Sequence, residues 1–320
     1  MATPRHGVDA SRREKKLRHV LARTGARPLH SGISDVERGE RRMRDRALVL
    51  RWTIGNVSTH GYDVLRRSLH GAMRVFGPSA RYVVCVNTVP LSVARARAGA
   101  VPGHVEWLDV TGMLDARLRP HLDGALTEGT SWKFAPVRVA PDAYELALDN
   151  DCVLWRMPEA IRAWLDDPRG ESCVLAEDVR PAFGQFAREC GTAPRNSGIR
   201  GLPPGLDLTA EMIRVLDSRG MLLTSELDEQ GLQVAAITSA RETHVVTVDE
   251  VSICSPFPPH RPALGECGAH FVGLNAHRLS WTLPDGRNAC EETRAHFARL
   301  RPALDRLVGI DDARERVVAL

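Results

Sequence analysis

Residues 146–155 read L-A-L-D-N-D-C-V-L-W, and this stretch decides how we interpret the fold. The apolar residues indicate a buried strand that ends at two carboxylates, Asp149 and Asp151. Further strands are expected at 47–54, 81–87, 104–110 and 172–178, with helices at 62–76 and after Pro158 between them. This alternation predicts an α/β fold with a mixed, mostly parallel sheet, a Rossmann-like nucleotide-binding half and helices on both faces.

The second half of the chain is less regular. Helices are expected at 206–216, 227–237 and 287–309, the last interrupted at Pro302, and strands after 196 and at 243–248. Residues 132–140 predict a helix that breaks near Pro141, and the Pro- and Gly-rich stretch 255–268 predicts a loop. Residues 1–45 have little apolar periodicity and predict a basic, flexible tail. The alternative is a basic segment that makes weak contact with an acidic surface or a membrane.

Composition excludes several classes of protein. The 320 residues are 43% hydrophobic and carry a net charge of +3, so no nucleic-acid partner is expected. Seven Cys without a C-x-x-C pair, several of them in apolar runs, predict reduced, buried side chains in a cytoplasmic protein. No apolar run reaches about 18 residues, so no transmembrane segment is expected.

Polar residues follow several of the predicted strands. Ligands of α/β sheets bind outside the carboxyl ends of the strands, where Asp149, Asp151, Thr53–Asn56, Asn87 and Glu177-Asp178 all lie. Two neighbouring carboxylates that converge at a bend suit Mg²⁺ or Mn²⁺, which prefer oxygen ligands. The alternative for the D-N-D motif is a solvated strand end.

Four short motifs surround D-N-D in a definite order. Trp132-Lys133-Phe134 precedes it, and Asn196-Ser197-Gly198, Asp228-Glu229-Gln230 and His270-Phe271-Val272-Gly273 follow it. In this order and spacing, residues 46–281 resemble the GT-A nucleotide-sugar glycosyltransferases, especially the family-8-like, glycogenin-like branch. The resemblance implies a single GT-A-like catalytic domain at 46–320, with a nucleotide-sugar half at 46–178 and an acceptor half at 179–320.

The resemblance also implies roles for individual residues. Asp149, Asp151 and His270 match the ligands of a Mn²⁺ or Mg²⁺ ion, and Lys133 matches the basic residue that neutralises donor charge. Asn196 matches the residue facing the transferred sugar, and Asp228 and Glu229 match residues near the reacting carbon. The remaining implied donor-binding positions are Thr53, Asn56, Asn150 and Gly273. The late Lys-Pro of the family is absent after Gly273, which leaves His277 or Arg278 as its replacement.

The implied activity is a metal-dependent glycosyltransferase of the hexosyltransferase type. It would move a sugar from a nucleoside-diphosphate sugar, with a UDP-sugar expected, to an unidentified acceptor hydroxyl. The resemblance favours retention of configuration, and the alternative is inversion with Asp228 or Glu229 as the base. One alternative is a nucleotidyltransferase on a related α/β fold, although the loop after the first strand lacks the Gly-rich, basic character that triphosphate binding needs. Another alternative is a non-catalytic nucleotide-sugar-binding protein.

Each candidate residue also has a purely structural interpretation. Asp228 fits a capping box with Ser225 at a helix start, and Glu229 fits the same first turn. His270 fits a partly buried histidine, Asn196 a turn residue and Lys133 a surface residue of a helix.

Overall fold

The computed structural model describes residues 47–122, 130–218, 220, 222–280 and 282–310. The predicted tail, 1–45, lies outside these ranges. Most of the strands and helices expected in the first half form close to the predicted positions, so the order of elements around the D-N-D stretch is the predicted one.

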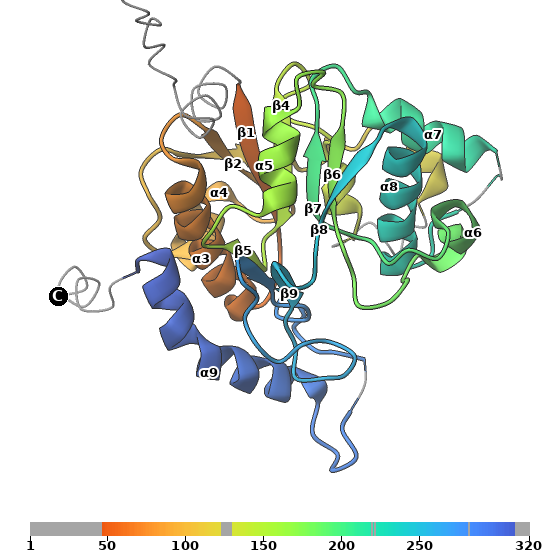
Figure 1. Ribbon diagram of the computed structural model, residues 1–320. Helices are drawn as coiled ribbons and strands as arrows, with labels where there is room; N and C mark the ends of the chain where they lie inside the picture. The colour runs from red at the N-terminus through yellow and green to blue at the C-terminus, as the bar shows by residue number, and fades with distance from the viewer. Residues whose placement is uncertain (1–46, 123–129, 219, 221, 281, 311–320) are drawn as a thin grey trace, which may run out of the picture. The chain divides into compact units, whose positions relative to one another are not determined.

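A seven-stranded sheet forms the centre of the described chain, in the order β3-β2-β1-β4-β7-β6-β8 (Figure 1). Only β7 runs antiparallel to its neighbours, so the sheet is mixed and mostly parallel, as predicted. In the parallel part, Thr53 of β1 lies beside Asp149 of β4, so the carboxyl ends of both strands meet at one edge. The strands are β1 (Leu48–Ile54), β2 (Arg81–Val86), β3 (Val105–Asp109), β4 (Tyr144–Asp149), β6 (Cys173–Ala176), β7 (Asn196–Leu202) and β8 (Thr243–Val246).

A second, three-stranded sheet brings a late segment of the chain to the D-N-D turn. It contains β5 (Cys152–Leu154), β9 (Val251–Ile253) and β10 (Gly268–His270), and the sequence predicted none of these strands. β10 pairs antiparallel with β5, with His270 opposite Cys152, and Phe271 N donates to Asp151 O at 2.8 Å. The pairing therefore places His270 next to the two carboxylates.

Helices cover both faces of the large sheet, as predicted. Along β6, Val174 and Ala176 pack into one apolar cluster, and Cys173 and Leu175 pack into another, because successive side chains of a strand point to opposite faces. The first cluster includes residues of α3 (Thr59–Phe76), α4 (Leu91–Ala98) and α5 (Glu159–Asp166). The second includes residues of α7 (Leu208–Asp217) and α8 (Glu226–Ala240), two helices that pack on each other (Figure 1).

The remaining elements are short, except for the last helix. They are η1 (Arg119–His121), η3 (Thr130–Phe134), η4 (Gly184–Phe186), α6 (Ala187–Cys190) and α9 (Ala289–Val308). α9 packs on α3, where Arg67 forms a buried ion pair with Asp305 at 2.6 Å. All seven cysteines are free, and six of them are buried, which agrees with the expected reduced side chains.

Two helix predictions were wrong. The stretch 132–140 forms only the end of the 3-10 helix η3, because Pro136 has no N–H to donate and disfavours helical geometry at Ala135. In contrast, α9 continues through Pro302 without interruption. Pro302 has no N–H to donate to the Ala298 carbonyl, but both residues are exposed, so a water molecule can donate this hydrogen bond instead. Phe297 and Leu304 are buried and keep the helix packed on either side.

Candidate active site

A cavity of about 570 Å³ lies at the carboxyl ends of β1 and β4. Most of the residues that the sequence singled out line it, whereas Asp228, Arg278 and the strand-end residues Asn87, Glu177 and Asp178 do not. Those lining it are Thr53, Asn56, Lys133, Asp149, Asn150, Asp151, Asn196, Glu229, His270 and Gly273. The rule that ligands bind at the carboxyl ends of strands thus led to residues that line one cavity.

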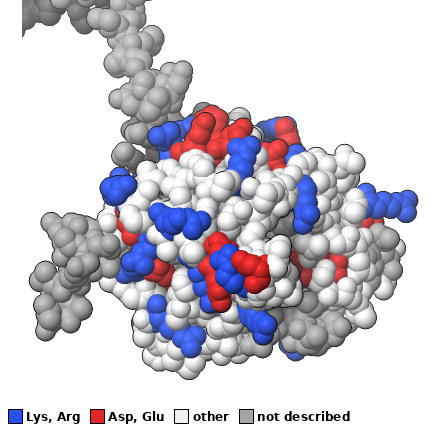
Figure 2. Space-filling view, turned by 90° about the horizontal axis from the view of Figure 1, so that it is seen from below, with Lys and Arg blue, Asp and Glu red and all other residues white. Residues whose placement is uncertain are grey.

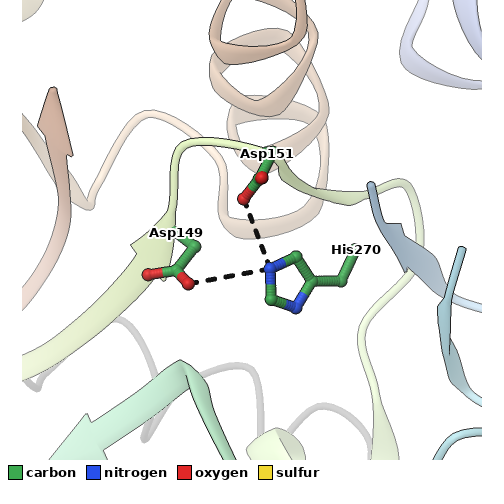
Figure 3. A group of neighbouring side chains, drawn as sticks. All are labelled: Asp149, Asp151 and His270. Carbon is green, nitrogen blue, oxygen red and sulfur yellow. Dashed lines mark ion pairs between the residues drawn. The ribbon is translucent and has the colours of Figure 1, made fainter. Parts of the chain in front are cut away.

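Asp149, Asp151 and His270, which all line this cavity, point toward one another (Figure 3). Asp149 ends β4, Asp151 follows in the turn, and His270 ends β10. His270 Nε2 lies 3.6 Å from Asp149 Oδ2 and 3.3 Å from Asp151 Oδ1. One ligand atom from each residue fits within 4.8 Å of the others, so the three side chains can meet at a single point.

The three side chains fit a divalent cation. Neighbouring ligands of an octahedral Mg²⁺ lie about 3 Å apart, which is close to the observed separations. Apart from the ion-pair contact with His270 Nε2 at 3.3 Å, Asp151 Oδ1 is buried without a hydrogen-bond partner in the described chain, whereas Oδ2 accepts from Asn275 Nδ2 at 3.0 Å. A buried carboxylate oxygen without a donor is costly unless a cation satisfies it. Burial opposes protonation of His270, but Asp151 and Asp149 raise its pKa, so the site attracts positive charge.

Lys133 supplies a fixed cation on the cavity wall. Its Nζ lies 2.9 Å from Asp149 Oδ1 and 3.4 Å from Glu229 Oε2. Burial opposes its charge, but Asp149 and Glu229 keep the pKa of Lys133 above its ordinary value. Burial also opposes ionisation of Asp149, but Lys133 and His270 hold the pKa of this carboxyl below its usual value. The η3 turn therefore positions a paired ammonium group rather than a surface lysine.

Glu229 is the second acidic group at Lys133. It is buried in the first turn of α8, and this burial raises its pKa to about 7. Asp228, its neighbour, does not line the cavity. Its carboxylate instead accepts from Gln185 N at 2.8 Å and from Ser225 N at 3.0 Å, and it completes the capping box with Ser225. Asp228 therefore caps the helix α8, which was the alternative to the expected position near the reacting carbon.

The two asparagines are held by hydrogen bonds at the cavity wall. Asn196 begins β7, and its side chain donates to Asp178 Oδ2 at 2.9 Å and accepts from Gly198 N at 2.7 Å. Asn150 donates to Asn275 Oδ1 at 2.6 Å. Asn196 is thus a strand residue rather than a turn residue, and the Asn150 amide braces the segment that also contacts Asp151.

The sequence analysis missed three buried residues of the cavity floor: Arg51, Arg200 and Gln233. Arg51 Nη2 donates to Thr53 Oγ1 at 3.1 Å and to the Lys133 carbonyl at 3.0 Å. Arg200 donates to the Gln233 side chain, which donates in turn to Glu229. The available signal was a charged residue inside an otherwise apolar strand, in L-V-L-R-W for Arg51 and in G-I-R-G-L for Arg200.

The end of the cavity near β1 contains an aromatic side chain and an exposed asparagine rather than a cluster of charged groups. Trp132 packs so closely on Gly55 that a Cβ there would lie 2.4 Å from the indole ring. Asn56 is exposed beside it, and His277 Nε2 contacts the Asn56 carbonyl at 3.1 Å. Of the two replacements considered for the missing lysine, His277 lines this cavity and Arg278 does not.

Comparisons with known proteins concern the fold. No protein-family model matches the sequence, and no curated protein is similar to it. Among solved structures, an active-site mutant of LgtC is 11% identical, with a TM-score of 0.50 over 78% of this chain and 95% of that chain. The galactosyltransferase LgtC with donor and acceptor sugar analogues is 12% identical, with a TM-score of 0.49 over 82% and 95%. Mouse xyloside xylosyltransferase 1 is 13% identical, with a TM-score of 0.45 over 72% and 98%.

The likeness to the LgtC mutant and the order of strands together confirm the predicted GT-A-like fold. Within the described ranges, no helix combines the length and the apolar character that crossing a bilayer requires.

Proposed function

We propose that this protein is a metal-dependent glycosyltransferase that moves a sugar from a nucleoside-diphosphate sugar to an acceptor hydroxyl. The observation that carries the proposal is the convergence of Asp149, Asp151 and His270 within 4.8 Å in the cavity at the strand ends. A divalent cation held by these residues, Mn²⁺ or Mg²⁺, would offset the negative charge of the leaving nucleoside diphosphate.

The chain's own residues would bind and orient the donor. The nucleoside would lie at the end of β1, against Trp132 and Asn56, with the diphosphate directed towards His270. Lys133 would exchange part of its contact with Asp149 for a phosphate oxygen, because a charge-assisted hydrogen bond to phosphate is of similar strength. Asn196, fixed by Asp178, would face the transferred sugar.

Glu229 is the carboxyl group that we place beside the anomeric carbon. It lines the cavity, and its Oε2 lies 3.4 Å from Lys133 Nζ. We propose retention of configuration, in which Glu229 stabilises the positive charge that develops on the sugar and removes no proton. This assignment, a UDP-sugar donor and membership of the family-8-like branch all rest on the order of motifs around D-N-D.

Calorimetry with UDP, with and without Mn²⁺, tests the proposal. We expect binding that requires the metal and that the Asp151→Asn substitution abolishes. Asp142→Asn serves as the control, because Asp142 is exposed in a turn outside the cavity and is expected to bind like the wild type. A preference for UTP over UDP would support a nucleotidyltransferase instead, and binding that ignores the metal would overturn the role of the cluster.

A screen of nucleotide sugars for donor hydrolysis would then identify the sugar. Release of UDP without an acceptor reports on the donor half of the reaction alone. Metal-dependent UDP binding without hydrolysis of any donor would favour a non-catalytic binding protein.

A further inference from the structure

A second, smaller cavity of about 240 Å³ adjoins the candidate active site. Val57 and His277 line both cavities, so the loop after β1 and the segment around His277 separate them. The smaller cavity is lined by Val57, Ser58, Thr59, His60, Arg97, His277 and Arg294. None of the roles discussed above uses His60, Arg97 or Arg294.

The lining of this cavity is basic. On the face shown in Figure 2, basic and acidic side chains are interspersed, whereas none of the seven residues lining this cavity is acidic. His60, Arg97, His277 and Arg294, which we call the basic pocket, come from α3, α4, the segment after β10 and α9. Asp63, the carboxylate that acts on His60, is already engaged by Arg67 at 2.6 Å. The pocket therefore brings together two guanidinium groups and two imidazole rings from four separate parts of the chain.

The two guanidinium groups are held in place by neutral partners. Arg294 Nη2 donates to the carbonyl oxygens of His277 at 3.0 Å and Ala276 at 3.3 Å. Arg97 lies over the Tyr62 ring at 5.6 Å and reaches Asn56 Oδ1 at 3.5 Å. Among the described residues, no ion pair neutralises either group. Since a guanidinium carries five N–H donors, each retains donors for a ligand.

We propose that the basic pocket is an anion subsite that binds a phosphate group beside the candidate active site. Arg97 on α4 and Arg294 on α9 both line the pocket and keep donors for a ligand, and guanidinium groups bind phosphate oxygens with paired hydrogen bonds. An anion in the pocket would also offset the charge of the two guanidinium groups. The proposal does not rest on the transferase activity, because it depends only on the two guanidinium charges and on the placement of these four side chains.

Inorganic phosphate is the probe for the first experiment. Binding is measured by calorimetry on the full chain in EDTA, at constant ionic strength, so that a metal at Asp149 and Asp151 plays no part. The double variant Arg97→Gln/Arg294→Gln is expected to weaken phosphate binding about tenfold or more, since hydrogen bonds between charged groups are among the strongest that proteins make.

The matched control is Arg95→Gln/Arg306→Gln. It removes the same charge from the same two helices, α4 and α9, at exposed positions outside the pocket. We expect this control to bind phosphate like the wild type. An equal loss in both double variants would mean that phosphate responds only to net charge, and the subsite would be overturned.

Location is tested independently with tungstate, a phosphate mimic that scatters anomalously. Crystals soaked in tungstate should show an anomalous peak between Arg97 and Arg294, and a peak only elsewhere would overturn the proposal. Repeating the phosphate titration with saturating UDP and Mn²⁺ distinguishes two sources of the anion. Independent binding indicates a separate phosphate-bearing molecule, and mutual exclusion indicates that one anionic ligand extends from the larger cavity into the pocket.

Discussion

Gln233 lies one turn beyond Glu229 on α8, and its Nε2 donates a hydrogen bond to Glu229 Oε1. Its Oε1 accepts from Arg200 Nη1 in the same buried layer. An amide has one donor end and one acceptor end, so Gln233 can join a cation to a carboxylate. Because Gln233 binds Glu229 Oε1, the other oxygen, Oε2, faces Lys133 Nζ at 3.4 Å. The two contacts together orient the carboxyl group that we place beside the sugar.

We expect Gln233→Met to destabilise the protein by about 1–3 kcal/mol, because it leaves Arg200 and Glu229 buried with unmet hydrogen bonds. Urea unfolding at neutral pH measures the effect. Gln230→Met is the control on the same helix: Gln230 is only partly buried and donates to the Ala182 carbonyl at 2.9 Å. Its replacement should cost about 1 kcal/mol or less. Equal losses for the two variants would argue against the relay from Arg200 to Glu229.

Gly198 is required by its contact with His270. A Cβ at position 198 would lie 2.5 Å from His270 Cε1 and 2.7 Å from Asn196 Oδ1. We therefore expect Gly198→Ala to displace the imidazole and to weaken Mn²⁺-dependent UDP binding by roughly 10–100-fold, the range found when groups that orient metal ligands are changed. Calorimetry with UDP and Mn²⁺ measures this loss.

Gly103→Ala controls for the loss of a glycine as such. Nothing lies within 4 Å of a Cβ at position 103, and its backbone does not require glycine. This variant should bind UDP and Mn²⁺ as the wild type does. Unchanged affinity in Gly198→Ala would show that His270 does not need its present position.

The sequence predicted many of the side chains that line the cavity, because these residues lie at or just after the ends of strands. Asp149 and Thr53 end neighbouring parallel strands, and strand ends can be read from the apolar runs before them. The choice between Asp228 and Glu229 could not be made in this way. Both lie in the first turn of α8, and only the packing of that helix decides which carboxylate reaches the cavity. The capping box with Ser225 was a readable signal that Asp228 was already engaged.

Short elements and buried charges escaped the sequence analysis for physical reasons. The strands around His270 have three residues each, and distant partners rather than local periodicity stabilise them. The helix α4 buries only Ala94 and Ala98, so it has no apolar stripe to recognise. Arg51 is stabilised by the Val137 carbonyl at 2.6 Å and by Glu145, and neither is near it in sequence.

Glu229 predicts a pH dependence of stability. Its ordinary pKa is 4.5, and burial raises the pKa to about 7 in the folded protein. Between these values the folded protein binds more protons than the unfolded chain, so stability falls as the pH rises. The folded protein should lose up to about 3 kcal/mol of unfolding free energy through Glu229 between about pH 4.5 and about pH 7.

Glu229→Gln isolates this contribution, because glutamine does not titrate. Urea unfolding of both proteins in EDTA, from pH 5 to pH 8, gives the difference in their free energies of unfolding at each pH. The wild type should lose stability relative to the variant as the pH rises through this window. A difference that stays constant, or that changes in the opposite direction, would contradict a Glu229 carboxyl group whose pKa is raised by burial.

Asp228 gives the complementary prediction, because its role is structural. Its carboxylate accepts from Gln185, Thr224 and Ser225, and these hydrogen bonds lower its pKa although burial opposes ionisation. At pH 7 we expect Asp228→Ala to cost about 1–3 kcal/mol of unfolding free energy. The loss should shrink as the pH falls below the ordinary value of 3.8, since protonation removes the same interactions from the wild type.

The control for this substitution is Glu226→Ala in the same turn of α8. Glu226 is exposed, so its replacement should change stability by about 0.5 kcal/mol or less. Calorimetry then separates structure from binding. Folded Asp228→Ala should keep metal-dependent UDP affinity, because Asp228 lies outside the cavity, whereas Gly198→Ala should lose it. A large loss of UDP affinity in Asp228→Ala, at a temperature where the variant is folded, would restore Asp228 to the site and remove the distinction drawn between it and Glu229.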